Sequence, residues 1–162
     1  MNGFKEVMEK LQQQNIEVQL VEHEAAFTME DADRAIEGIP GVRTKTLFLM
    51  NKKKTRFYLL IMDEDKRLDM AAFKDLVDDR QLKMASEEML YEKLGLQPGG
   101  VSPFGLLNNK DGDVEVFVDR DRAGEERMSF HPNTNEKTIF IKTVDLYSFL
   151  ENIGHPVKTV LL

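Results

Sequence analysis

Three groups of residues have the types and spacing to bind a carbonyl or a phosphate. The first is the segment 98–105, PGGVSPFG, in which glycines and prolines surround a single Val-Ser pair. Glycine reaches backbone angles that other residues avoid, and proline fixes its own φ, so this segment predicts a shaped loop rather than a helix or a strand. The amide groups exposed on such a loop can stabilise an anion or a developing oxyanion.

The second group is Lys45, which begins an apolar row on a predicted strand. Because side chains alternate along a strand, Lys45 shares a face with Leu47 and Leu49. Such a lysine either lines a cavity or, as strand-end lysines commonly do, extends its ammonium group into water.

The third group is the segment 131–135, HPNTN, which follows a predicted strand. It either contributes polar groups to a site or is only a turn whose asparagines cap their own backbone. Together, the three groups offer backbone donors, one cation and polar side chains that fix the orientation of a ligand.

Other kinds of site have little support in the sequence. The chain has no cysteine, and its three histidines are far apart and form no His-x-x-x-His pattern, so we expect neither a metal nor a cofactor. Ser102 is a poor candidate for a covalent nucleophile because it lacks the Gly-x-Ser-x-Gly context. In addition, the next residue, Pro103, has no N–H to offer to an oxyanion hole.

Length and charge limit the class of protein. The 162 residues predict one domain spanning 1–162, and 22 basic against 29 acidic residues give a net charge of −7. This charge argues against broad, non-specific binding of nucleic acid but leaves recognition of a nucleic-acid end open. The basic run Lys52–Arg56 is either a hairpin tip or a phosphate contact. No stretch resembles a signal peptide or a membrane span, so we expect a soluble, cytoplasmic protein.

The elements that must position these groups follow from periodicity and capping signals. Helices are predicted at 3–14 and 29–37, after Asp69, after Ser86 as far as Gly95, and from Thr143 or Asp145 to Asn152. Strands are predicted at 18–24, 43–50, 56–62, 82–84 and 114–119, and two further strand segments, MSFHPNTN (128–135) and KTIFIK (137–142), are split by a Pro/Asn turn. Segment 104–107 is predicted to pair with 114–119 as a second hairpin. Because the strands cluster in hairpins, the fold class is α+β, with an antiparallel or mixed sheet and helices packed outside it.

The motifs, in this order and spacing, resemble the YbaK/aminoacyl-tRNA synthetase-associated domain family. They are the strand 45–49, KTLFL, the loop 99–105, GGVSPFG, the turn 131–133, HPN, and the segment 27–32, FTMEDA. Within that family, the chain is most similar to the freestanding prolyl-tRNA editing proteins of the PrdX/ProX type. The resemblance covers essentially the whole chain, and the glycine loop is its most specific part.

The resemblance implies a barrel-like mixed sheet and a hydrolase that acts in trans on the ester of mischarged proline tRNA, chiefly alanyl-tRNA. The implied partner is the aminoacylated 3′ end of the tRNA, and prolyl-tRNA synthetase is left open as a second partner. The family's Gly-x-x-x-Pro loop corresponds to Gly99–Pro103, its lysine to Lys45 and its histidine to His131, with a looser match at Asn133.

We therefore predict two sets of site residues. The catalytic set consists of Lys45, Gly99, Gly100, Val101 and Ser102. The backbone amides of the loop residues are expected to stabilise the oxyanion, and Lys45 is expected to bind a phosphate or the loop backbone. The substrate-binding set consists of Thr46, Pro103, Gly105, His131 and Asn133. Helix 29–37 and the glycine loop are expected to form the walls of the pocket.

Three alternatives to alanyl-tRNA hydrolysis stay open at this point. Other branches of the family act on cysteinyl-tRNA of proline type. A domain of the same shape can also lose its chemistry and serve only as a sensor of charged tRNA or of an amino acid. An amidase or esterase acting on small molecules is the third alternative.

Overall fold

The computed structural model describes residues 3–25 and 28–162. Phe27, which belongs to the FTMEDA segment, lies outside these residues. The helices are α1 (Phe4–Gln13), α2 (Met29–Ala35), α3 (Met70–Val77), α4 (Glu87–Leu94), the 3-10 helix η1 (Pro103–Asn108) and α5 (Thr143–Asn152). The strands are β1 (Val18–Glu22), β2 (Val42–Asn51), β3 (Phe57–Asp63), β4 (Leu82–Met84), β5 (Val114–Asp119), β6 (Arg127–Phe130), β7 (Lys137–Lys142) and β8 (Val157–Val160).

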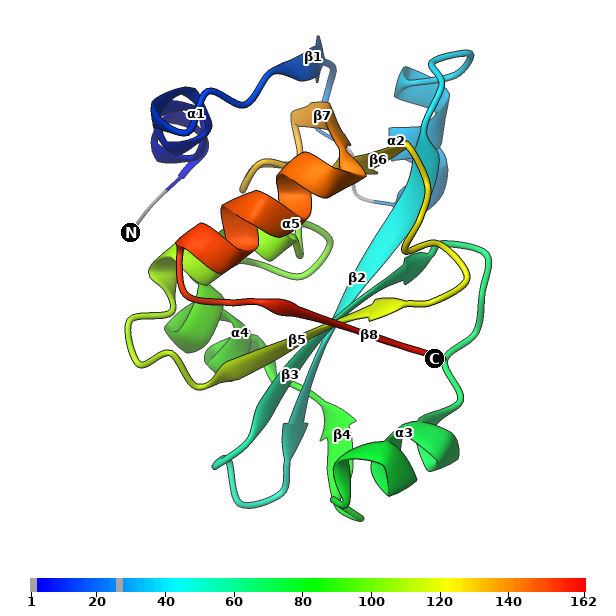
Figure 1. The fold of residues 1–162 in the computed structure, drawn as a ribbon, viewed down its shortest axis with the longest axis vertical. Helices are drawn as coiled ribbons and strands as arrows, with labels where there is room; N and C mark the ends of the chain where they lie inside the picture. Colours follow the sequence, from blue (N-terminus) through cyan, green and yellow to red (C-terminus); the bar gives the residue numbers. More distant parts are fainter. Residues whose placement is uncertain (1–2, 26–27) are drawn as a thin grey trace.

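The strands form one mixed sheet in the order β1-β7-β6-β2-β3-β5-β8, with β4 paired to β2. Four pairings are antiparallel (β1–β7, β6–β7, β2–β3 and β2–β4), and three are parallel (β2–β6, β3–β5 and β5–β8). Figure 1 shows β2 crossing the middle of the molecule, with α1, α4 and α5 gathered on one side and α3 lying apart beside β4. The predicted α+β class with a mixed sheet is confirmed.

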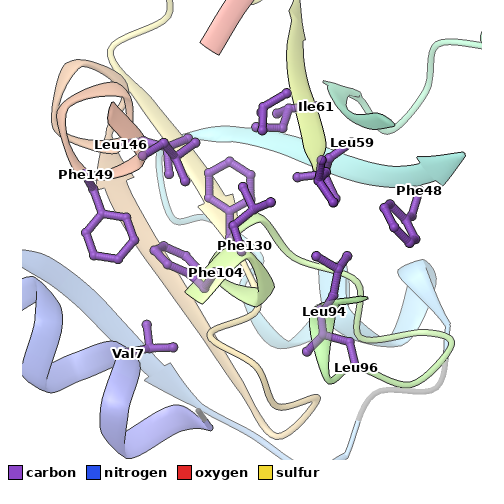
Figure 2. Close-up of a cluster of buried hydrophobic side chains, with 14 of the residues drawn as sticks. Val7, Phe48, Leu59, Ile61, Leu94, Leu96, Phe104, Phe130, Leu146 and Phe149 are labelled. Atoms are coloured by element: carbon purple, nitrogen blue, oxygen red, sulfur yellow. The ribbon is translucent and has the colours of Figure 1, made fainter. Parts of the chain in front are cut away.

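Two hydrophobic cores lie on opposite faces of β3. Alternate residues of this strand point to opposite faces, so Phe57, Leu59 and Ile61 join the larger core, which also contains side chains of α1, α4, η1 and α5. The intervening Tyr58, Leu60 and Met62 join the smaller core with Phe73 of α3. Figure 2 shows the larger core, where Phe104 packs against Phe130 and Phe149 with ring centroids 6.1 and 5.5 Å apart.

The capping signals mark the helix starts correctly. Thr28, Asp69 and Ser86 each accept a hydrogen bond from the backbone N–H three residues later, at 3.0 to 3.2 Å. Gly95 ends α4 in the left-handed conformation, with φ of 67°. None of the helices among the described residues is both long and apolar enough to cross a bilayer.

The predicted hairpin between 104–107 and 114–119 is wrong. Residues Pro103–Asn108 instead form the 3-10 helix η1, because Ser102 caps it and Pro103 occupies its first turn. Strand β5 pairs in parallel with β3 and β8. Strand β8 was not predicted, and its four partly exposed residues carry only a weak alternation signal.

Candidate functional site

A cavity of about 360 Å³ opens beside β2, between α2, the glycine loop and the β6–β7 turn. Of the predicted site residues, Lys45, Thr46, Gly99, Val101 and His131 line this cavity. The fold thus brings together parts of all three groups that the sequence identified, although they are separated by up to 86 positions (131 − 45) in the chain.

The glycine loop presents fewer available amides than predicted. Gly99 has φ of 86°, a left-handed angle that favours glycine. The Gly100 N–H donates to the Gln97 carbonyl at 3.1 Å, so this amide is already engaged in closing the turn. The N–H groups of Val101 and Ser102 form no hydrogen bond within the part of the chain that the structure describes. The Gly99 N–H likewise forms no hydrogen bond among the described residues, and Gly99 and Val101 both line the cavity, so their amides are the leading donors.

Three of the predicted residues lie behind the loop and are not among the cavity-lining residues. Ser102 is fully buried, and its Oγ accepts the Phe104 N–H at 3.1 Å, which caps η1. Pro103 starts that helix. Gly105 lies so close to Leu96 that an added Cβ would come within 2.6 Å of the leucine Cδ1. These residues therefore shape and support the loop.

Lys45 and Thr46 lie on β2, opposite Met62 and Ile61 of β3. Lys45 is half-buried at the cavity. Its ammonium group forms no hydrogen bond or ion pair with any residue that the structure describes. Of the two interpretations of Lys45, the structure thus supports the one in which it lines a cavity.

His131 lines the cavity and has one ring nitrogen that can accept a hydrogen bond. Its Nδ1 lies 3.1 Å from the Lys137 carbonyl oxygen, which can only accept, so Nδ1 carries the hydrogen and Nε2 is the acceptor in the neutral ring. Burial lowers the pKa of the His131 imidazole, which favours this neutral form. Asn133 has a different role: with φ of 58°, it donates from Nδ2 to the Phe104 carbonyl at 3.3 Å and joins the turn to η1.

Two carboxyl groups at the cavity were missed by sequence reasoning. Asp33 of α2 and Glu64, which directly follows β3, both line it. Burial raises the pKa of Glu64 to about 8; a hydrogen bond with Asp33 and the negative charges of Asp33 and Asp65 add to this rise, and the positive charge of Arg43 opposes it. Glu64 is therefore protonated at neutral pH and can donate a hydrogen bond to Asp33.

Arg43 holds α2 against β2. Its guanidinium donates to the carbonyl oxygens of Ile36, Ile39 and Gly41 at 3.0, 2.7 and 2.8 Å. These three carbonyls follow the last turn of α2, so this contact fixes the position of Asp33 relative to the strand.

The basic run Lys52–Arg56 forms the tip of the β2–β3 hairpin, as one of its two interpretations predicted. It lies at the far end of β2 from Lys45, roughly 20 Å away at the usual rise of a strand. None of its residues lines the cavity.

Three comparisons place this architecture among known proteins. The family described as "Aminoacyl-tRNA editing domain" matches residues 23–149. The prolyl-tRNA editing protein ProX of Acetoanaerobium sticklandii is 32% identical over 100% of this chain and 99% of its own length. Prolyl-tRNA synthetase associated domain-containing protein 1 of Danio rerio is 34% identical over 93% of this chain and 83% of its own length.

The fold itself has a solved counterpart. A crystal structure described provisionally as a trans-editing enzyme for prolyl tRNA synthetase superposes with a TM-score of 0.73. The superposition covers 98% of this chain and 96% of the other, at 21% sequence identity.

Proposed function

This chain belongs to the family of aminoacyl-tRNA editing domains, and on that basis we propose that it hydrolyses, in trans, the ester bond of mischarged proline tRNA. We propose alanine as the amino acid removed and cysteine as the alternative. The names of the relatives support the link to proline tRNA and make prolyl-tRNA synthetase a second candidate partner.

One observation carries this proposal: the cavity combines an available backbone donor with a cation and, among the residues that the structure describes, offers no activated nucleophile. The Val101 N–H and the Lys45 ammonium are both available there, whereas the Ser102 hydroxyl is buried and engaged in capping η1. An aminoacyl ester is already activated, so its hydrolysis needs a positioned water and donors aimed at the carbonyl oxygen rather than a protein nucleophile.

In the proposed mechanism, water attacks the ester carbonyl carbon and negative charge develops on the carbonyl oxygen. The Val101 N–H stabilises that charge, with the N–H of Gly99, which also lines the cavity, as a second donor. The His131 Nε2 accepts a hydrogen bond from the water or from the adjacent ribose hydroxyl. The bond between the carbonyl carbon and the ribose oxygen then breaks, and this oxygen takes up the proton that the attacking water loses. The products are a free amino acid and uncharged tRNA.

Lys45 has a binding role in this mechanism. An ammonium group without a protein partner, at the edge of a cavity, suits a phosphate of the terminal nucleotide. In this role Lys45 orients the ester for attack and takes no proton during the reaction.

The difference in size between the alanine and proline side chains explains why a separate editing activity is needed. A synthetase site built for proline excludes a smaller side chain weakly, because each missing methylene is worth only about 1–3 kcal/mol. A second, smaller cavity can instead reject proline by steric closure. The apolar part of the lining, formed by Ile36, Leu47, Val101 and Phe130, is the surface that would contact the side chain.

The direct test is to incubate the protein with alanyl-, cysteinyl- and prolyl-tRNA of proline type and to measure the release of free amino acid. We expect rapid release of alanine and little release of proline. Equal cleavage of simple alanine esters and of charged tRNA would point instead to a small-molecule esterase. Tight binding without release would point to a sensor.

A further inference from the structure

The tip of the β2–β3 hairpin carries three positive charges that no described protein group neutralises. Lys52, Lys53 and Lys54 occupy the turn between the two strands, and all three side chains are exposed. Their ammonium groups form no ion pair, hydrogen bond or cation–π contact with the part of the chain that the structure describes. Arg56, beside the turn, is by contrast engaged by two carboxylates. The segment Lys52–Lys54, called the basic tip below, is therefore available to an anionic partner.

Hydrogen bonds hold this turn in one shape. The Asn51 side chain is 7% exposed, and its Oδ1 accepts two backbone N–H groups of the turn at 2.8 and 3.1 Å. The Lys52 N–H donates to the Gln81 carbonyl at 2.9 Å, which ties the turn to the residue before β4. Lys54 has φ of 57°, a left-handed angle that glycine or asparagine adopts at lower cost. A lysine is thus unfavourable for the turn itself, and its charge is the feature that calls for a partner.

The composition of the turn favours a polyanion over a protein surface as that partner. Segment 51–55, NKKKT, has no apolar side chain, whereas protein interfaces are anchored by a buried apolar or aromatic centre. Phosphate groups need no such anchor, because ammonium groups bind them through charge and hydrogen bonds. Subtracting the three charges of the basic tip takes the formal net charge of the chain from −7 to −10. A nucleic acid is therefore repelled by the molecule as a whole and attracted to this tip.

The basic tip and Lys45 lie toward opposite ends of β2. Figure 1 shows this strand running from the region of α2, beside the cavity, to the hairpin at the bottom of the view. The separation along the strand, roughly 20 Å, corresponds to about six stacked nucleotides at the usual rise of about 3.4 Å. A tRNA whose terminal phosphate lies at Lys45 can therefore extend past its short unpaired 3′ tail and bring the start of its paired stem to the basic tip.

We propose that the basic tip binds phosphates of the acceptor stem, the double-stranded part of the tRNA next to its aminoacylated 3′ end. This inference rests on the function proposed above and adds a second contact outside the cavity. Lys45 holds the terminal nucleotide and the basic tip holds the duplex, so the two contacts together set the direction in which the tRNA leaves the cavity. Contacts to phosphate fix position and contribute affinity without reading the base sequence.

The test measures RNA binding without hydrolysis. Fluorescence anisotropy compares two labelled, uncharged RNAs: a hairpin with the acceptor-stem duplex and 3′ tail of proline tRNA, and a single strand with the tail alone. The triple variant Lys52→Gln, Lys53→Gln, Lys54→Gln should bind the hairpin RNA about tenfold or more weakly than the wild type, and the tail RNA within about twofold of it. The slope of log Kd against log salt concentration for the hairpin RNA should fall by about two to three, roughly one for each lost phosphate contact.

Two further variants control for charge and folding. The triple variant Lys52→Arg, Lys53→Arg, Lys54→Arg keeps the three charges and should keep the affinity for the hairpin RNA. The matched control removes the same charge from exposed lysines elsewhere, through the glutamine substitutions of Lys5, Lys10 and Lys142. It should bind the hairpin RNA nearly as the wild type does. Thermal unfolding establishes that each variant is folded.

The outcomes separate this inference from the proposed function. No binding of the hairpin RNA by the wild type, unchanged affinity in the glutamine variant of the tip, or equal losses in that variant and the matched control would overturn the docking site. A loss confined to the tip variant and the hairpin RNA, without cleavage of alanyl-tRNA by the wild type, would support the docking site and refute the hydrolase. Cleavage of alanyl-tRNA together with unchanged affinity in the tip variant would do the reverse.

Discussion

Ser102 and Phe104 are joined by a hydrogen bond of 3.1 Å in which the serine hydroxyl oxygen accepts the phenylalanine N–H. Because this contact caps η1, the predicted effect of Ser102→Ala is on stability. Loss of such a cap typically costs about 1 kcal/mol, which corresponds to a fall in Tm of roughly 2–4 °C for a chain of this size. Deacylation of alanyl-tRNA should stay within a few-fold of the wild-type rate. A folded Ser102→Ala protein with no turnover would restore the covalent nucleophile.

Replacement of Lys45 should separate binding from stability. The ammonium group has no partner among the described residues, so Lys45→Ala removes no protein contact of that group. Removing a charge-assisted contact to phosphate lowers affinity by about 10- to 100-fold, and we expect kcat/KM for alanyl-tRNA to fall by a similar factor with little change in Tm. Lys83→Ala, on the exposed face of β4, serves as a charge-matched control. Equal losses in both variants would indicate a diffuse charge effect.

Because the amide of Val101 is available to the ligand, we expect the deacylation rate to be unusually sensitive to the substitution Val101→Pro. Val101→Pro removes the N–H and should lower kcat by about 10²–10³-fold, the range found for loss of one oxyanion donor. Val101→Ala keeps the N–H and should lose only a few-fold. Gly100→Ala should also be tolerated, because an added Cβ meets only the Gln97 carbonyl oxygen at 3.7 Å. Single-turnover deacylation with folded variants tests all three, and an active Val101→Pro enzyme would contradict the assignment.

The raised pKa of Glu64 predicts how stability depends on pH. The unfolded chain ionises Glu64 near its ordinary pKa of 4.5, whereas the folded protein holds the proton up to about pH 8. The folded state therefore binds more protons between these values, and its stability falls as pH rises through that window. Glu64→Gln removes this contribution and should raise Tm relative to the wild type at pH 8–9.

The size of this effect is limited because Glu64 is partly exposed to solvent. We expect a difference on the order of 1 kcal/mol, or roughly 2–4 °C in Tm, at pH 9, and a much smaller one at pH 5. Asp33, Asp65 and Arg43 act on the same carboxyl, so Asp33→Asn should shift the profile in the same direction. A Tm difference between wild type and Glu64→Gln that does not change with pH would show that the pKa of Glu64 is not raised in the folded protein.

Local signals predicted the elements whose structure is decided locally. The capping residues Thr28, Asp69 and Ser86 each bind a nearby N–H, so short sequence windows were sufficient to place the helix starts. Segment 104–107 was mistaken for a strand because Phe104 and Leu106 are both buried in the core. A 3-10 helix started by Pro103 accommodates the same spacing.

Only part of the candidate site could be predicted from the sequence, because some of its residues are brought to the cavity by tertiary packing alone. Lys45, the glycine loop and His131 stand out because their residue types are unusual in their local context. Asp33 and Glu64 do not: they occur in acidic stretches that normally face solvent, and only the packing of α2 against the end of β3 brings them to one cavity. The engagement of the Gly100 amide likewise depends on the three-dimensional course of the loop.

The three backbone carbonyls that Arg43 binds allow the width of the cavity to be changed by a mutation that does not touch the ligand. Arg43 is not a cavity-lining residue, yet its hydrogen bonds set the distance between α2 and β2, which form two walls of the cavity. Lysine would be a poor substitute, because its compact charge cannot reproduce the planar fork that reaches three oxygens at once. A directed-evolution search for a changed amino-acid preference would therefore do well to begin at position 43.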